Sequence, residues 1–159
     1  MKTIQDLYPA DFAHCYGCGR LNQQGLHIRT EWTGDQGVAR FRPRAEHVAL
    51  PGFVYGGLLA SLIDCHSIGT AAAAFMLAGG SQPGVDPSPR FVTASLEVQF
   101  LKPTPMDAEL VITARPVEVG QRKVIVESTL SANGIDCVRG RVVAVQVPAD
   151  MIKAKEAGH

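Results

Sequence analysis

The chain has 159 residues, of which 46% are hydrophobic and 19% are charged, a balance that suits one soluble domain with a packed core and excludes disordered and fibrous proteins. Its fifteen basic residues equal its fifteen acidic residues, so the net charge provides no general attraction to nucleic acid or to an anionic membrane. We therefore expect no nucleic-acid partner and no membrane partner.

Residues 1–24 are rich in turn-forming residues and form a lead-in before the first expected strand. The first fifteen residues contain acids and a proline where a secretory signal needs a basic start and an apolar stretch, so we expect a cytoplasmic protein. The cysteines, Cys15, Cys18, Cys65 and Cys137, are then expected to be reduced thiols. The C-x-x-C pair in the lead-in is half of a zinc knuckle, but no second pair follows at knuckle spacing. A turn packed by small thiols is favoured over a metal site.

Two short strands are expected next, in GLHIRTEW and GVARFRP, joined by a turn over residues 33–37. Residues 56–78 are the one long helical candidate, with no proline and many alanines and leucines. This stretch has the length of a membrane span, but Asp64 and His66 interrupt it and no basic cluster flanks it. We therefore predict a buried core helix.

A loop rich in glycine and proline, residues 79–89, follows the helix. Four β-rich segments separated by turn signals come after it: VTASLEVQFL, ELVITARPVEV, KVIVESTLSA and CVRGRVVAVQV. Two strands, one helix and four strands predict a single α+β domain over residues 25–148, followed by a frayed tail at residues 149–159. A lone helix that is apolar around its whole circumference must be wrapped by the sheet or covered on its other side.

The two sides of the predicted helix differ in bulk. At about 100° per residue, the bulky side chains gather on one side, including Leu58, Leu59, Leu62, Met76 and Leu77, and small residues occupy the other, including Gly57, Ala60, Ser61 and Ala71. The small face also carries Asp64. It allows a second backbone to approach closely, so we expect at least a dimer.

Asp64 is a carboxylate within an apolar helix. Burying it without a partner would cost roughly several kcal/mol or force its protonation. One interpretation is a structural carboxylate that binds a neighbouring segment, and the other is a functional group.

Gly56 and Gly57 favour the functional interpretation. They leave backbone N–H groups uncovered where the helix begins, and a helix N-terminus stabilises negative charge, including the oxygen that develops on an attacked carbonyl. The alternative is that these glycines only form the tight turn into the helix. An oxyanion site and a buried carboxylate together suggest hydrolysis of an acyl compound.

The sequence resembles the hotdog-fold acyl-CoA thioesterases, particularly the PaaI-type (phenylacetate-degradation) branch. GFVYGGLLASLID matches the family pattern GF-x-HGG-x-x-x-x-L-x-D, VTASLEVQFLKPTP matches a strand with Ser or Thr near its start, and CYGCGRLNQQGLHI resembles the lead-in of some members. The resemblance extends over residues 15–147. It implies a six-stranded antiparallel sheet wrapped around one long central helix, assembled into homodimers and often homotetramers.

By this resemblance, Gly56 and Gly57 polarise the thioester carbonyl of an acyl- or aryl-CoA. Asp64 acts as the nucleophile or as the general base for water, and Thr93 assists. Coenzyme A is then part of the substrate, with no separate cofactor and no metal.

The sequence departs from the family pattern at two positions near the glycines. Tyr55 replaces the usual His, and its hydroxyl can donate a hydrogen bond but does not titrate near neutral pH. Ala49 stands where several relatives carry Asn or Gln. His47 and His66 are weak substitutes for the missing groups, and core packing is favoured for His66.

Four residues are candidates for binding the substrate. Tyr55 and His47 lie next to the expected oxyanion site in the sequence. Arg90 and Lys102, near strand ends, are candidates for holding the phosphates of coenzyme A.

Two other functions remain open. A hotdog hydratase or dehydratase needs a His and an acid working together, and Tyr55 in place of His argues against it unless His47 reaches the site. A non-catalytic acyl-CoA-binding protein is compatible with the departures at Tyr55 and Ala49.

The spacing along the helix predicts a shared site. Asp64 lies seven to eight residues after Gly56 and Gly57, roughly 10 to 12 Å along the axis, whereas attack needs about 3 to 3.5 Å. We therefore expect each site to combine the glycines of one subunit with Asp64 of the other.

Overall fold

A computed structural model describes residues 1–148 and 151 of the chain. The strands are β1 (Glu31–Trp32), β2 (Gly37–Phe41), β3 (Phe91–Phe100), β4 (Leu110–Val119), β5 (Lys123–Ala132) and β6 (Ile135–Gln146). The long helix is α1 (Gly56–Ala78), and the described residues also form three short 3-10 helices, η1 (Ile4–Leu7), η2 (Ala10–Phe12) and η3 (Ala45–His47). The expected C-terminal tail lies outside the described residues apart from Met151.

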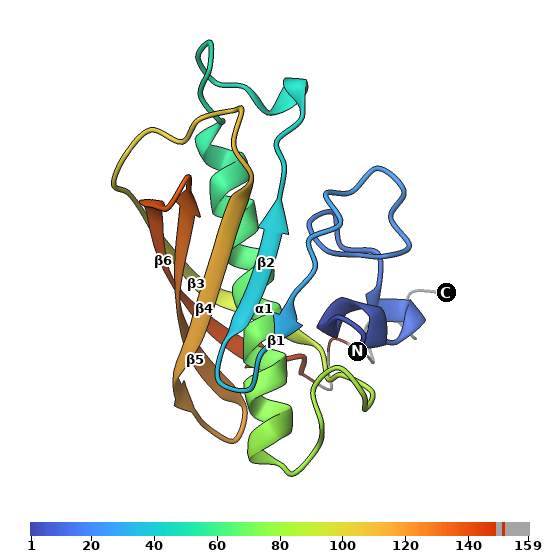
Figure 1. The fold of residues 1–159 in the computed structure, drawn as a ribbon. Coiled ribbons are helices and arrows are strands. Elements are labelled where there is room, and N and C mark those ends of the chain that lie inside the picture. The colour runs from blue at the N-terminus through green and yellow to red at the C-terminus, as the bar shows by residue number, and fades with distance from the viewer. Residues whose placement is uncertain (149–150, 152–159) are drawn as a thin grey trace.

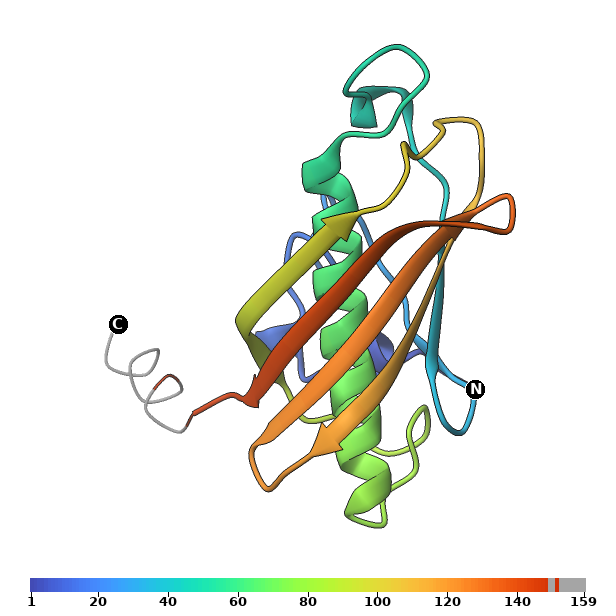
Figure 2. The ribbon, with the colours of Figure 1, turned by 90° about the vertical axis from the view of Figure 1, so that its left-hand side faces the viewer.

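The six strands form one antiparallel sheet in the order β1-β2-β4-β5-β6-β3. The sheet curves around α1, which runs along its inner face (Figures 1 and 2). β3 forms one edge of the sheet, beside β6. The predicted α+β hotdog architecture is therefore confirmed.

A two-residue turn sets the hairpin between β5 and β6. Asn133 and Gly134 both have positive φ angles, 53° and 76°, as a type I′ turn requires. Because these two residues complete the turn, β6 begins at Ile135, two residues before the predicted start at Cys137.

α1 lies between the sheet and the N-terminal segment (Figure 1). On the sheet side, a Cβ atom at Gly140 of β6 would lie only 2.2 Å from Ile63 Cγ2, so the strand and the helix approach closely here. Ala71, expected on the unpartnered small face, is fully buried, and Leu77, expected with the buried bulky residues, is 50% exposed near the end of the helix. The free face of α1 is therefore confined to its first turns.

Residues 25–30, which we expected to be part of the first strand, form backbone hydrogen bonds with the lead-in instead. The amides of Leu26 and Ile28 donate to the carbonyls of Tyr16 and Gly17, at 2.8 and 2.9 Å. Because these bonds join the segment to the lead-in rather than to β2, the strand is reduced to Glu31–Trp32.

A buried polar chain joins the lead-in to α1 and β2. His66 is fully buried, and its Nε2 donates to the Gly37 carbonyl at 3.1 Å, so its Nδ1 accepts from the Thr30 hydroxyl at 2.9 Å. Gln5 Nε2 donates in turn to Thr30 Oγ1 at 3.0 Å. Burial lowers the pKa of His66 to about 4, so the ring is neutral near pH 7. His66 has the core role favoured by the sequence.

Among the described helices, α1 has the length and apolar composition that could cross a membrane. Most of its apolar stretch is buried inside the fold, which agrees with the predicted core helix.

Candidate active site

Asp64 and Thr93 meet on the free face of α1. Asp64 lies on the third turn of the helix, and Thr93 lies on the edge strand β3, where the register with β6 shifts between Thr93 and Ser95. Thr93 Oγ1 donates a hydrogen bond of 2.5 Å to Asp64 Oδ1. The sequence singled out both residues, and the fold places their side chains in contact.

The environment of Asp64 raises the pKa of its carboxyl group. Burial, followed by the nearby charge of Cys15, raises the pKa of this carboxyl above its ordinary value, while the hydrogen bond from Thr93 and the charge of Arg90 act in the opposite direction. A partly desolvated carboxylate with one oriented oxygen is a suitable nucleophile or general base.

The start of α1 presents two glycine amides. Gly56 and Gly57 are the first two helical residues, and the N–H groups of a first turn have no acceptor within the helix. The ring of Tyr55 folds over Gly57, where a Cβ atom would lie 2.6 Å from Tyr55 Cζ. The Tyr55 amide donates to the His47 carbonyl at 2.8 Å, which fixes the entry into the helix.

Two grooves flank this helix start. The first, of about 530 Å³, is lined by Tyr16, Gln24, Leu26, Arg44, Glu46, His47, Tyr55, Gly57, Leu58 and Ser61. The second, of about 460 Å³, is mostly apolar and is lined by Ala49, Leu50, Phe53, Val54, Gly56, Leu59, Phe100, Leu101, Lys102, Pro103 and Thr104. Tyr16 and Gln24 come from the lead-in, which sequence reasoning did not connect with the site because no periodic pattern reports such a long-range contact.

His47 is buried beside the first groove. Its Nδ1 accepts a hydrogen bond of 3.0 Å from the Arg44 amide, which leaves Nε2 to carry the proton of the neutral ring. Burial, followed by the charge of Arg44, lowers the pKa of His47. The neutral ring can therefore donate a hydrogen bond to a bound molecule.

The two basic candidates occupy different surroundings. Lys102 is exposed at the rim of the apolar groove. Arg90 is half-buried, with its guanidinium 4.8 Å from the centre of the Tyr8 ring and a 2.9 Å hydrogen bond to the Phe91 carbonyl. Arg90 lines neither of the two grooves, and its charge lowers the pKa of Asp64.

The predicted residues thus form two groups along one helix. Gly57 lies with Tyr55 and His47 at the first groove, whereas Asp64 lies with Thr93 farther along. At 1.5 Å per residue, the intervening residues separate the two groups by roughly 10 Å along the axis. Within this chain, Asp64 does not reach a carbonyl held at the glycine amides.

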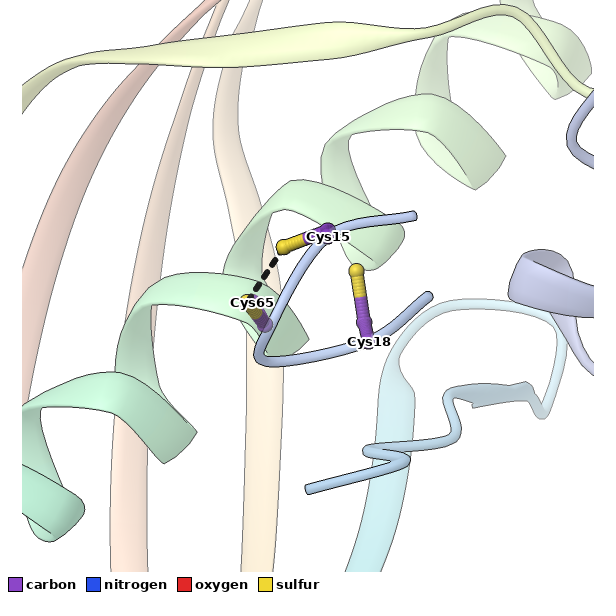
Figure 3. Close-up of side chains that lie close together, drawn as sticks. All are labelled: Cys15, Cys18 and Cys65. Atoms are coloured by element: carbon purple, nitrogen blue, oxygen red, sulfur yellow. Dashed lines mark hydrogen bonds between the residues drawn. The ribbon is translucent and has the colours of Figure 1, made fainter. Parts of the chain in front are cut away.

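A cluster of cysteine side chains includes Cys65, the residue that follows Asp64 on α1. Cys15 and Cys18 from the lead-in and Cys65 from α1 bring their sulfur atoms together, all within 4.8 Å of one another (Figure 3). The C-x-x-C pattern points only to Cys15 and Cys18, because Cys65 is far away along the chain.

The chain matches known proteins in both sequence and structure. Residues 51–138 match the thioesterase superfamily. A thioesterase superfamily protein from Shewanella loihica PV-4 is 45% identical, with 87% of this chain and 97% of that chain covered and a TM-score of 0.67. The PaaI protein of the E. coli phenylacetic acid degradation operon shares the fold at 15% identity, with 77% and 81% covered and a TM-score of 0.63.

A protein from Streptococcus mutans UA159, solved bound to acetyl-CoA, shares the fold at 15% identity, with 76% of this chain and 88% of that chain covered and a TM-score of 0.60. The search of curated proteins found no match. The superfamily match covers more than half of the chain, and the Shewanella protein is similar over almost all of it. The chain belongs to the thioesterase superfamily and has its hotdog fold.

Proposed function

We propose that this protein hydrolyses the thioester of an acyl- or aryl-CoA. The observation that carries the proposal is the pairing of Asp64 with Thr93 on the same free helix face that begins with the amides of Gly56 and Gly57. Membership of the thioesterase superfamily supports the reaction class. Acetyl-CoA bound to the Streptococcus mutans neighbour supports a coenzyme A thioester as the substrate.

In the proposed mechanism, the amides of Gly56 and Gly57 donate to the thioester carbonyl oxygen. They stabilise the negative charge that develops on it during attack, as does the positive end of the helix. Asp64 either attacks the carbonyl carbon directly or takes a proton from an attacking water, and the hydrogen bond from Thr93 to Oδ1 holds the carboxylate in position. Collapse of the tetrahedral intermediate breaks the C–S bond and releases coenzyme A as the thiolate. If Asp64 attacks directly, water then hydrolyses the acyl–Asp64 anhydride, which releases the acid and regenerates the carboxylate.

The two grooves beside the glycines suggest how the substrate lies. The apolar groove contains Phe53 and Phe100 and suits an acyl or aryl group, and Lys102 places a positive charge at the rim of this groove. The other groove presents the Tyr55 side chain, which takes the place of the usual His as a hydrogen-bond donor to the carbonyl or to its water.

We propose that the complete site forms between two subunits. β3 is an edge strand, with the apolar side chains of Leu96 and Phe100 39% and 57% exposed. An edge strand has unpaired backbone N–H and C=O groups that can pair with another chain. Two copies of α1 in antiparallel orientation would place the Asp64 of one subunit near the glycine amides of the other, which one subunit alone cannot do.

The test is a thiol-release assay over straight-chain and aryl acyl-CoA thioesters. We expect turnover on at least one class of thioester, abolition by Asp64→Asn, and normal turnover in Asp107→Asn, a matched exposed carboxylate outside the site. Loss of enoyl absorbance without thiol release would indicate hydration instead. Tight binding without turnover across the panel would indicate an acyl-CoA-binding protein.

A further inference from the structure

Three of the four cysteines converge on one point beside α1. Cys15 Sγ and Cys65 Sγ are 3.8 Å apart, and Cys18 Sγ lies within 4.8 Å of both (Figure 3). The fourth cysteine, Cys137, lies elsewhere, with its thiol directed at the Ile135 and Pro103 carbonyls. A disulfide would use only two of the three converging sulfur atoms, whereas a metal ion uses all of them.

The loop Cys-Tyr-Gly-Cys-Gly is built tightly around these sulfur atoms. A Cβ atom on Gly17 would lie 2.2 Å from Cys65 Sγ, and one on Gly19 would lie 2.5 Å from the Cys15 amide nitrogen, so neither position has room for a side chain. The thiolate is the form of cysteine that binds metal, and a loop without room for side chains keeps these sulfur atoms close together.

We propose that Cys15, Cys18 and Cys65 form a zinc site that joins the lead-in to α1. Tetrahedral zinc with Zn–S bonds of about 2.3 Å places its sulfur ligands about 3.8 Å apart. The Cys15–Cys65 separation already has this value. No sulfur–sulfur separation exceeds 4.8 Å, so small side-chain rotations need to bring the sulfur atoms closer by at most about 1 Å.

The surroundings suit an ion with three thiolate ligands. Zn²⁺ and three thiolates carry a net charge of −1, and the half-buried guanidinium of Arg90 interacts electrostatically with all three cysteines. Three protein ligands leave the fourth tetrahedral position to a water molecule or a small anion. The Tyr8 hydroxyl is buried, has no hydrogen-bond partner among the described residues and lies within electrostatic range of the three thiols. It is a candidate hydrogen-bond donor to that fourth ligand.

The zinc site goes beyond the thioesterase reaction, and its role is structural. Cys65 directly follows Asp64 on α1, so the ion would hold the lead-in against the helix turn that carries the proposed catalytic carboxylate. The site does not depend on that reaction, because it can be tested by metal binding alone.

The experiment titrates the reduced, chelator-treated protein with Co²⁺ under anaerobic conditions and then with Zn²⁺. We expect one Co²⁺ per chain, with the near-ultraviolet thiolate-to-cobalt absorption and strong visible bands of a tetrahedral thiolate site, and displacement of cobalt by zinc. Cys15→Ser, Cys18→Ser and Cys65→Ser should each weaken binding at least 100-fold. Cys137→Ser, the matched control, should bind as the wild type does.

A second measurement uses only the wild-type protein, so its result does not depend on whether the cysteine variants fold. In zinc-loaded wild-type protein, a thiol reagent should react with three fewer cysteines than after chelation, and zinc should raise Tm. The proposal is overturned if the reduced wild-type protein binds no stoichiometric cobalt or zinc. It is also overturned if cobalt binds without thiolate absorption, or if Cys137→Ser weakens binding as much as the cluster variants do.

Discussion

Thr93 on β3 donates a 2.5 Å hydrogen bond to the carboxylate of Asp64 on α1. This bond connects the edge of the sheet to the free face of the central helix and orients a carboxyl group whose pKa burial raises. A partly buried carboxylate costs more free energy than one at the surface, which indicates a function rather than a contribution to folding.

Thr93 is expected to position Asp64 for the reaction. Thr93→Ala should lower kcat roughly 10- to 100-fold, in the range of a lost positioning group, and should leave KM nearly unchanged. Thr93→Ser keeps the hydroxyl and should restore most of kcat. Steady-state kinetics of both variants, with circular dichroism to check folding, decide the matter. An unchanged kcat in Thr93→Ala would show that the hydroxyl has only a structural role.

The protein is expected to be at least a dimer that pairs through the β3 edge. Sedimentation at micromolar concentration should give at least twice the 17.0 kDa mass of the chain. Leu96→Lys, which places a charge on the exposed face of β3, should shift the protein toward monomer and lower its activity. Val119→Lys, a similarly exposed position at the end of β4, is the matched control and should leave the assembly intact. A wild-type species of 17.0 kDa would exclude the dimer.

Gly140 is expected to be required for packing β6 against α1. Gly140→Ala would place a Cβ atom 2.2 Å from Ile63 Cγ2, and overpacking of this kind costs about 1 to 3 kcal/mol. Urea unfolding should show this loss in the free energy of unfolding. Gly79→Ala at the helix end meets its nearest atoms at an ordinary 3.6 Å and should be nearly neutral. Equal stability of the two variants would contradict the close helix–strand contact.

The strands and the helix could be predicted because their signals are local. β5 occupies Lys123–Ala132 and β4 ends at Val119, as alternation and turn residues indicated, and α1 occupies the predicted 56–78. Gly56, Gly57 and Asp64 were singled out by the same kind of signal, since their spacing depends only on helical geometry, whereas Thr93 followed from the resemblance to hotdog thioesterases.

The remaining features depend on contacts between distant segments, which local patterns do not report. Residues 25–30 have the alternation of a strand, yet their amides bond to Tyr16 and Gly17. Ala71 was expected to be free but is buried in the fold. Cys65 joins Cys15 and Cys18 only because the lead-in folds back onto α1, a tertiary contact that cysteine spacing does not encode.

The most direct test of the shared active site mixes two inactive homodimers, Asp64→Asn and Gly57→Val, after unfolding and refolding them together. The Val side chain would displace the Tyr55 ring and cover the amide end of α1, whereas Asp64→Asn removes the attacking group. A hybrid dimer then contains one site with both defects and one with neither. Statistical mixing makes about half of the dimers hybrids, so about a quarter of wild-type activity should return. If verified hybrids form from folded parents and remain inactive, Asp64 and the glycine amides do not act across the subunit interface, and the account is contradicted.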